Sequence, residues 1–126
     1  GRLITVPTES AIMSFIELCE YVGADAMYVM PTGMICSGWG EAKSTVEFQT
    51  IDVDLDAYIQ DALDAIEYAI GDTTTKWGAE RAKNGHPAPF PLKYIEIGNE
   101  DFGPVYWERY EKIYQALSAK NPDLIY

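Results

Sequence analysis

Basic residues are scarce in this sequence of 126 residues, in which nine lysines and arginines stand against 20 aspartates and glutamates. The resulting formal net charge is −11. A surface of this sign repels the phosphates of nucleic acids and of anionic lipids, because binding to either depends on clustered lysine and arginine. We therefore predict no nucleic-acid partner and no membrane partner.

Metal ligands and long apolar runs are also missing. The sequence has one histidine, His86, and its two cysteines, Cys19 and Cys36, do not form a ligand pair. We therefore expect no zinc site and no disulfide framework. No apolar run approaches the roughly 20 residues that a membrane-spanning helix needs. The opening GRLITVPTES lacks the layout of a signal peptide and an initiating Met, which suggests the middle of a longer chain, and nothing indicates the compartment.

The composition is nevertheless that of a folded domain. Hydrophobic residues make up 48% of the sequence and aromatic residues 13%. These proportions are typical of globular rather than disordered chains. The length allows one domain with a core, and the sequence has no internal repeat and no low-complexity tract.

Apolar residues recur at helical spacing in three stretches. The first follows Pro7, the second begins at Asp54 and the third begins at Pro104, while Gly23 and Gly71 supply stops for the first two. The expected buried faces consist of Ile12, Phe15, Ile16, Cys19 and Val22; of Leu55, Tyr58, Ile59, Ala62, Leu63, Ile66 and Ala69; and of Tyr106, Tyr110, Ile113, Tyr114 and Leu117. Each set falls on one side of its helix.

Short apolar runs between these helices predict strands. The strands are expected at 26–30, 93–97 and 123–126. The first, AMYVM, is apolar throughout, as in a strand that is buried on both faces. Two long loops, 32–54 and 72–91, complete the chain, with a short extended piece expected at 46–48.

The order helix, strand, helix, strand, helix, strand predicts an α/β fold with a parallel sheet. Two architectures satisfy it: a small flavodoxin-like sheet, or part of an eight-stranded (β/α)8 barrel, which typically needs about 250 residues. Both place their chemistry beyond the carboxyl ends of the strands. In this chain the two long loops and Gly98-Asn99-Glu100 are expected there.

The stretch YIEIGNEDFG, residues 94–103, ends an apolar strand with two glutamates four residues apart. If extended geometry persists, Glu96 and Glu100 lie on one face, about 13 Å apart at ~3.3 Å per residue. A retaining glycosidase pair needs roughly 5–5.5 Å and an inverting pair about 6.5–9.5 Å, so these two glutamates are not such a pair. We expect Glu96 to be a buried, hydrogen-bonded residue of the sheet.

Asn99 and Glu100 have two interpretations. A carboxylate at the mouth of a site, beside an amide side chain, suits proton donation to a leaving group, and Asn99 would then hold a substrate hydroxyl. Alternatively, the two residues cap the helix that begins near Pro104. Glu41, in the first long loop, is a further carboxylate that could approach, although no pattern demands it.

The run DALDAIEYAIGDTTTKWGAERAKNGHPAPFPLKYIEIGNEDFGPVYWERYEKIY, residues 61–114, resembles the catalytic barrel of the α-L-arabinofuranosidases of glycoside hydrolase family 51. In that family a helix ending in EYANGD precedes a WG…R…NGHP.PF loop and a YIEIGNE strand, and FIELCEYVGADAMYVM is similar to the preceding helix and strand. The resemblance covers nearly the whole chain and is weakest at 34–52. It departs at Ile70, where Asn is usual, and at Asp101-Phe102, where Asn-Trp is common, so the substrate preference stays open.

The resemblance implies a partial (β/α)8 barrel of about three βα units over residues 1–126, a retaining mechanism and no cofactor. Glu100 matches the family's general acid/base, and Asn99 matches the neighbour that binds the sugar near its 2-hydroxyl. The implied substrate is an arabinofuranosyl-containing carbohydrate that loses terminal α-L-arabinofuranosyl groups. The family's nucleophile is a glutamate at the end of the seventh strand, beyond this chain, so the fragment alone is expected to be inactive.

Three other residues have weaker assignments. Trp77 and Trp39 are candidates for stacking on sugar rings, and burial in the core is the alternative for both. His86, in the sequence Asn-Gly-His-Pro, is expected to order a turn rather than to contact substrate.

Two further functions stay open. A non-catalytic α/β binding or interaction module requires a closed, monomeric sheet, and another glycosidase of the same barrel clan also ends its fourth strand in Asn-Glu. A barrel fragment instead has open sheet edges and an exposed apolar face, which predicts self-association through those edges.

Overall fold

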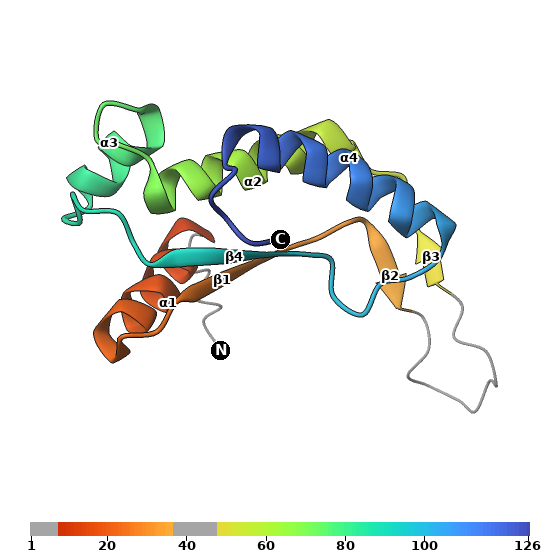
Figure 1. Cartoon of the computed structure of the whole chain (residues 1–126), viewed down its shortest axis with the longest axis horizontal. Coiled ribbons are helices and arrows are strands. Elements are labelled where there is room, and N and C mark those ends of the chain that lie inside the picture. Colours follow the sequence, from red (N-terminus) through yellow and green to blue (C-terminus); the bar gives the residue numbers. More distant parts are fainter. Residues whose placement is uncertain (1–7, 37–47) are drawn as a thin grey trace, which may run out of the picture. The chain divides into compact units, whose positions relative to one another are not determined.

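The computed structural model describes residues 8–36 and 48–126, and within them the side chains of residues 14–34 and 50–126. The elements in chain order are α1 (Thr8–Val22), β1 (Ala26–Met30), β2 (Met34–Cys36), β3 (Phe48–Thr50), α2 (Leu55–Ile70), α3 (Lys76–Lys83), β4 (Leu92–Ile97) and α4 (Pro104–Lys120) (Figure 1). The three predicted helices and the first two predicted strands are confirmed as α1, α2, α4, β1 and β4. The remaining three elements lie in the stretches that were expected to be loops.

The described residues form two compact units. The first unit runs up to Met27 and includes Ile66–Lys93, and the second runs from Tyr28 to Ala65 and includes Tyr94–Tyr126. Strands β1 and β4 form a two-stranded sheet.

Strands β1 and β4 are parallel, as predicted. The backbone N–H of Ala26 donates to the carbonyl of Pro91 at 2.7 Å where the strands begin, and the N–H of Gly98 donates to the carbonyl of Met30 at 2.9 Å where they end. The predicted third strand appears as one parallel bridge between Tyr94 and Ile125. The carboxyl ends of β1 and β4 therefore lie side by side, and the residues that follow them meet there.

The expectation that β1 is buried on both faces is wrong. Ala26 and Met30 are each 1% exposed, whereas Met27 and Val29, which alternate with them, are 46% and 45% exposed. Successive side chains of a strand point to opposite faces, so one face of β1 is packed and the other is left open by the described part of the chain.

The predicted buried face of α1 is right for Ile16 and Cys19 and wrong for Phe15 and Val22, which are 51% and 62% exposed. The side chain of Ile12 lies outside the described residues. Phe15 and Val22 lie seven residues apart, which places them on one stripe of the helix. No described residue covers that stripe.

Helix α4 packs through Ile113 and Leu117, which are fully buried in the second unit. Lys112 and Asp56 form an ion pair at 2.7 Å between α4 and α2. The tyrosines of α4 are less buried than expected, since Tyr114 is 42% exposed and its ring stacks on that of Tyr110 at 6.1 Å.

The stretch after β1 contains an antiparallel pair of short strands. Strand β2 pairs with β3 in a register that joins Met34 to Thr50 and Cys36 to Phe48. The extended piece expected at 46–48 overlaps β3 only at Phe48, because 46 and 47 lie outside the described residues.

Candidate active site

The backbone changes direction immediately after β4. Gly98 and Glu100 have φ angles of 79° and 54°, in the left-handed region. Extended geometry therefore does not persist to Glu100, and the separation of about 13 Å that it implied from Glu96 does not apply. Glu96 itself is half-buried rather than buried.

Gly98 lies where a side chain would not fit. A Cβ at this position would stand 3.0 Å from Cγ2 of Thr32 and 3.1 Å from a ring carbon of Tyr106, and would also overlap the carboxylate of Asp101. Since φ at Gly98 also favours glycine, both the conformation and the space require this residue. The turn that follows is thereby packed closely against the end of β1.

Asn99 and Glu100 project from this turn with exposed side chains. The residue that precedes α4 as its N-cap is Gly103, and no side chain forms a capping hydrogen bond there. The alternative that Asn99 and Glu100 cap the helix is therefore wrong. Both side chains are exposed in the part of the chain that the structure describes.

Asp101 is tied back to the end of β1. The hydroxyl of Thr32 donates to Oδ2 of Asp101 at 2.5 Å, and Thr32 is only 1% exposed. The guanidinium of Arg109 donates through Nη1 to the carbonyl of Thr32 at 2.7 Å and through Nη2 to the carbonyl of Ile51 at 3.1 Å. Asp101 is thus half-buried and engaged with the end of β1.

Tyr106 anchors the other side of the turn. Its hydroxyl donates to the carbonyl of Ile97, the last residue of β4, at 2.9 Å. Burial raises the pKa of Tyr106, and Tyr110, Asp101 and Glu96 raise it further. The hydroxyl therefore stays protonated and keeps its role as a donor.

Trp77 belongs to the first unit, whereas Asn99 and Glu100 belong to the second. Its backbone N–H, near the start of α3, donates to Oε1 of Glu67 at 2.8 Å, and Nζ of Lys76 lies 4.3 Å from the centre of its ring. Its indole Nε1 is buried and has no hydrogen-bond partner among the described residues. Trp39 and Glu41, the other candidates of the first loop, lie outside the described residues.

Arg81 organises the connection between α3 and β4. It is fully buried, and its guanidinium donates to four backbone carbonyls. The acceptors are Tyr68 and Gly71 at 2.8 Å and His86 and Pro87 at 3.0 Å. A buried guanidinium needs such partners, because each unsatisfied donor in the interior carries a desolvation cost.

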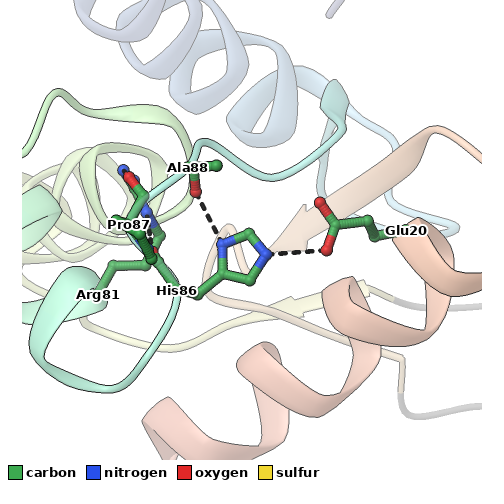
Figure 2. A network of polar contacts seen from close by, with 5 residues as sticks. All are labelled: Glu20, Arg81, His86, Pro87 and Ala88. Carbon is green, nitrogen blue, oxygen red and sulfur yellow. Dashed lines mark hydrogen bonds and ion pairs between the residues drawn. The ribbon is translucent and has the colours of Figure 1, made fainter.

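His86 lies in the same loop, and both of its ring nitrogens lie within hydrogen-bond distance of protein oxygens. Its Nδ1 is 2.8 Å from the carbonyl of Ala88 and its Nε2 is 2.8 Å from Oε2 of Glu20, while its ring stacks on Phe90 at 3.9 Å. Figure 2 shows the imidazole between these two acceptors. This arrangement is that of a residue that orders a turn.

No group of three or more histidine, cysteine, aspartate or glutamate side chains among the described residues is placed to hold a metal ion. Likewise, no helix in the described ranges is long and apolar enough to cross a membrane.

The fold is thus an α/β arrangement with two parallel strands, and an exposed carboxyl follows the end of one of them. The family described as "Alpha-L-arabinofuranosidase 1 domain" matches residues 8–126. The chain therefore belongs to the α-L-arabinofuranosidase 1 domain family, in accord with the resemblance stated from its motifs.

Individual relatives are similar over most of the chain. "Alpha-L-arabinofuranosidase 2" of Arabidopsis thaliana is 37% identical over 111 residues, which cover 87% of this chain and 15% of the relative. The "Extracellular exo-alpha-L-arabinofuranosidase" of Streptomyces chartreusis is also 37% identical over 111 residues, which cover 87% of this chain and 13% of that protein. The chain thus spans only a small part of the length of the relatives it matches.

A solved structure supports the same conclusion. The arabinose-bound structure of MgGH51 α-L-arabinofuranosidase matches 89% of this chain and 17% of its own, with a TM-score of 0.67 and 28% identity. The α/β arrangement of two parallel strands and four helices thus corresponds to part of a family-51 enzyme.

Three residues near Glu100 were not identified from the sequence as parts of the site: Thr32, Asp101 and Arg109. Thr32 follows β1 by two residues, so its place at the carboxyl end of a predicted strand was a usable signal. Arg109 lies within a helix, and its contacts with Thr32 and Ile51 had no sequence signal.

Proposed function

We propose that this chain is part of a retaining α-L-arabinofuranosidase and carries its general acid/base, Glu100. In this proposal residues 1–126 form a fragment of a (β/α)8 barrel, with β4 as its fourth strand. The parallel pairing of β1 with β4 and the bridge from Tyr94 to Ile125 support a barrel segment, because consecutive barrel strands pair in this way.

The observation that carries the proposal is the placement of Glu100. Its side chain is exposed in the turn that follows a parallel strand, where barrel enzymes hold their catalytic residues. It is not engaged in capping α4. Asn99, exposed beside it, is proposed to bind the sugar near its 2-hydroxyl.

The proposed reaction is a double displacement. Glu100 donates its proton to the glycosidic oxygen while a carboxylate from outside this chain attacks the anomeric carbon, so that the leaving group departs and a covalent glycosyl-enzyme forms. Glu100, now a carboxylate, removes a proton from water, which attacks the same carbon and releases the arabinose and the nucleophile. The proposed substrates are carbohydrates with terminal α-L-arabinofuranosyl groups.

The fragment by itself is proposed to be inactive. The two carboxylates nearest to Glu100 in the sequence do not replace that nucleophile, because Asp101 accepts a hydrogen bond from the hydroxyl of Thr32 and Glu96 lies within β4.

Trp77 is retained as a proposed contact to the sugar, although it belongs to the first unit.

The test is substitution of Glu100 in the full-length protein that contains this chain. Glu100→Gln keeps the shape of the side chain and removes the proton donor, so we expect kcat on an unactivated arabinofuranoside to fall by about 10²–10⁴-fold. Glu108→Gln, at another exposed glutamate, in α4, is the matched control and should leave kcat unchanged. Near-normal kcat in Glu100→Gln would refute the proposed role.

A further inference from the structure

The backbone at Glu100 sets the direction in which its side chain leaves the turn. Among the described residues no hydrogen bond restrains this side chain, which is exposed, and φ at Glu100 is 54°. This conformation is one that residues other than glycine rarely adopt, and it persists only where the neighbouring residues enforce it. The residues on each side of Glu100 therefore determine the direction in which its side chain leaves the backbone.

On one side, the chain is held at Gly98, whose N–H donates to the carbonyl of Met30 at 2.9 Å. On the other side, it is held at Asp101, whose carboxylate accepts the hydroxyl of Thr32 at 2.5 Å. Hydrogen bonds to an ionised acceptor are shorter and stronger than neutral ones. Both attachments lead to the end of β1, so Asn99 and Glu100 lie between two fixed points.

Thr32 is itself rigidly placed. It is 1% exposed, and Nη1 of Arg109 donates to its carbonyl at 2.7 Å. At the next residue, Gly33, a Cβ would stand 2.5 Å from Nη1 of Arg109 and 2.7 Å from a methyl group of Val53. The buried hydroxyl of Thr32 thus has little freedom to follow Asp101 if the turn moves.

We propose that Thr32 and Asp101 are positioning residues that hold Glu100 in its left-handed conformation and so aim its carboxyl at the glycosidic oxygen. This inference rests on the proposed function of Glu100. A general acid must lie within hydrogen-bond distance of the atom that it protonates. Misplacement by about 1 Å costs about 10²-fold in rate.

The experiment uses the full-length protein and two aryl α-L-arabinofuranosides, one with a phenol leaving group and one with 2,4-dinitrophenol. Thr32→Val removes the hydroxyl and keeps the shape of the side chain. We expect its kcat/KM to fall by about 10- to 100-fold for the phenyl substrate and by less than about threefold for the dinitrophenyl substrate. The difference arises because dinitrophenolate departs without protonation, whereas phenolate needs the acid.

Conservative variants and a matched control complete the design. Thr32→Ser keeps the donor and Asp101→Asn keeps an acceptor oxygen, so both should stay within about threefold of the parent on the phenyl substrate. Asp101→Ala removes the acceptor and should behave like Thr32→Val. Thr73→Val, at an exposed position of the first unit, should change neither substrate's kcat/KM.

The outcomes separate the two proposals. If Glu100→Gln keeps its activity, the proposed function itself fails, whatever Thr32→Val does. If Glu100→Gln is inactive but Thr32→Val loses kcat/KM equally on both substrates, Thr32 has only a structural role and the positioning proposal fails alone. No loss in Thr32→Val would also overturn it.

Discussion

Glu100 combines an unfavourable backbone conformation with an exposed carboxyl. The left-handed region costs a residue other than glycine about 1–2 kcal/mol, and such strain is concentrated at functional sites. Three groups hold the turn around it: the N–H of Gly98, the hydroxyl of Thr32 and the hydroxyl of Tyr106. A surface residue with no function gains nothing from this arrangement, whereas a proton donor gains a fixed position.

A second single residue, His86, leads to a prediction about the dependence of stability on pH. The carbonyl of Ala88 and the carboxylate of Glu20 are both acceptors, so both ring nitrogens must carry protons to satisfy them. Burial by itself lowers the pKa of His86, and so does the Arg81 charge, but the hydrogen bonds to Glu20 and Ala88 together with the charge of Glu20 outweigh them, and the pKa is raised. The stabilisation of the folded chain by these contacts of His86 is therefore complete below about pH 6.5, and it is lost as the pH rises through the raised pKa of His86.

The measurement is an NMR titration, in which the sole histidine gives a single imidazole signal. We expect the pKa of His86 to lie above 6.5 in the parent chain and to fall in Glu20→Gln, which removes the negative charge. Glu17→Gln, an exposed neighbour on α1, is the control and should leave the pKa of His86 unchanged. A pKa that does not respond to Glu20→Gln would contradict the assigned contact.

The sequence singled out Glu100 as a candidate but did not predict its conformation. The strand was expected to end at Ile97, as it does, but extended geometry was extrapolated beyond that end and placed Glu100 on the face of Glu96. Gly98 was the available signal, since glycine after a strand often marks a left-handed turn. The contact of Asp101 with Thr32 was out of reach, because 69 residues separate the two positions.

At the scale of elements, the long helices and the apolar strands were predictable from periodicity, and α3 was not. Helix α3 has eight residues, KWGAERAK, and the side chain that it buries most completely is an arginine. A method that searches for apolar periodicity cannot detect a helix whose buried residue is Arg81. The N-cap at Thr75, which accepts from the N–H of Gly78 at 3.2 Å, was the usable signal.

For β1, in contrast, the sequence predicted more burial than the structure shows. The run AMYVM predicted two covered faces, and only the face of Ala26 and Met30 is covered by the described chain. The local sequence shows that a face of a strand is apolar. Whether other residues bury that face depends on segments elsewhere in the protein. In the proposed barrel, further strands and helices supply that cover.

For the whole molecule, the central fact is that the matched part of this chain corresponds to 15% of an Arabidopsis relative and 17% of a solved family-51 chain. Apolar side chains are correspondingly exposed on the described surface: Phe15, Leu18, Tyr21, Val22, Met27 and Val29. Exposed groups of this kind promote association, because burying them removes apolar area from water.

We therefore predict that the isolated chain self-associates. Light scattering should show an apparent mass above 14.1 kDa that rises with protein concentration, in the presence of a reductant that keeps Cys19 free. The double substitution Met27→Lys and Val29→Lys places charges on the open face of β1 and should shift the distribution toward the monomer. A monomer at every concentration in the parent chain would contradict this prediction and favour a self-contained module.

The most direct test of the central claim uses Glu100→Ala in the full-length protein, an activated aryl α-L-arabinofuranoside and sodium azide. The activated leaving group departs without an acid, and the covalent intermediate then accumulates because no base activates water. Azide needs no deprotonation, so it attacks the intermediate, and two successive inversions yield a product of retained configuration.

If Glu100 is the general acid/base, azide restores turnover and the product is α-L-arabinofuranosyl azide. A β-configured azide would identify Glu100 as the nucleophile, and full activity of Glu100→Ala without azide would remove it from the reaction. Either result would contradict the assignment of Glu100 as the general acid/base.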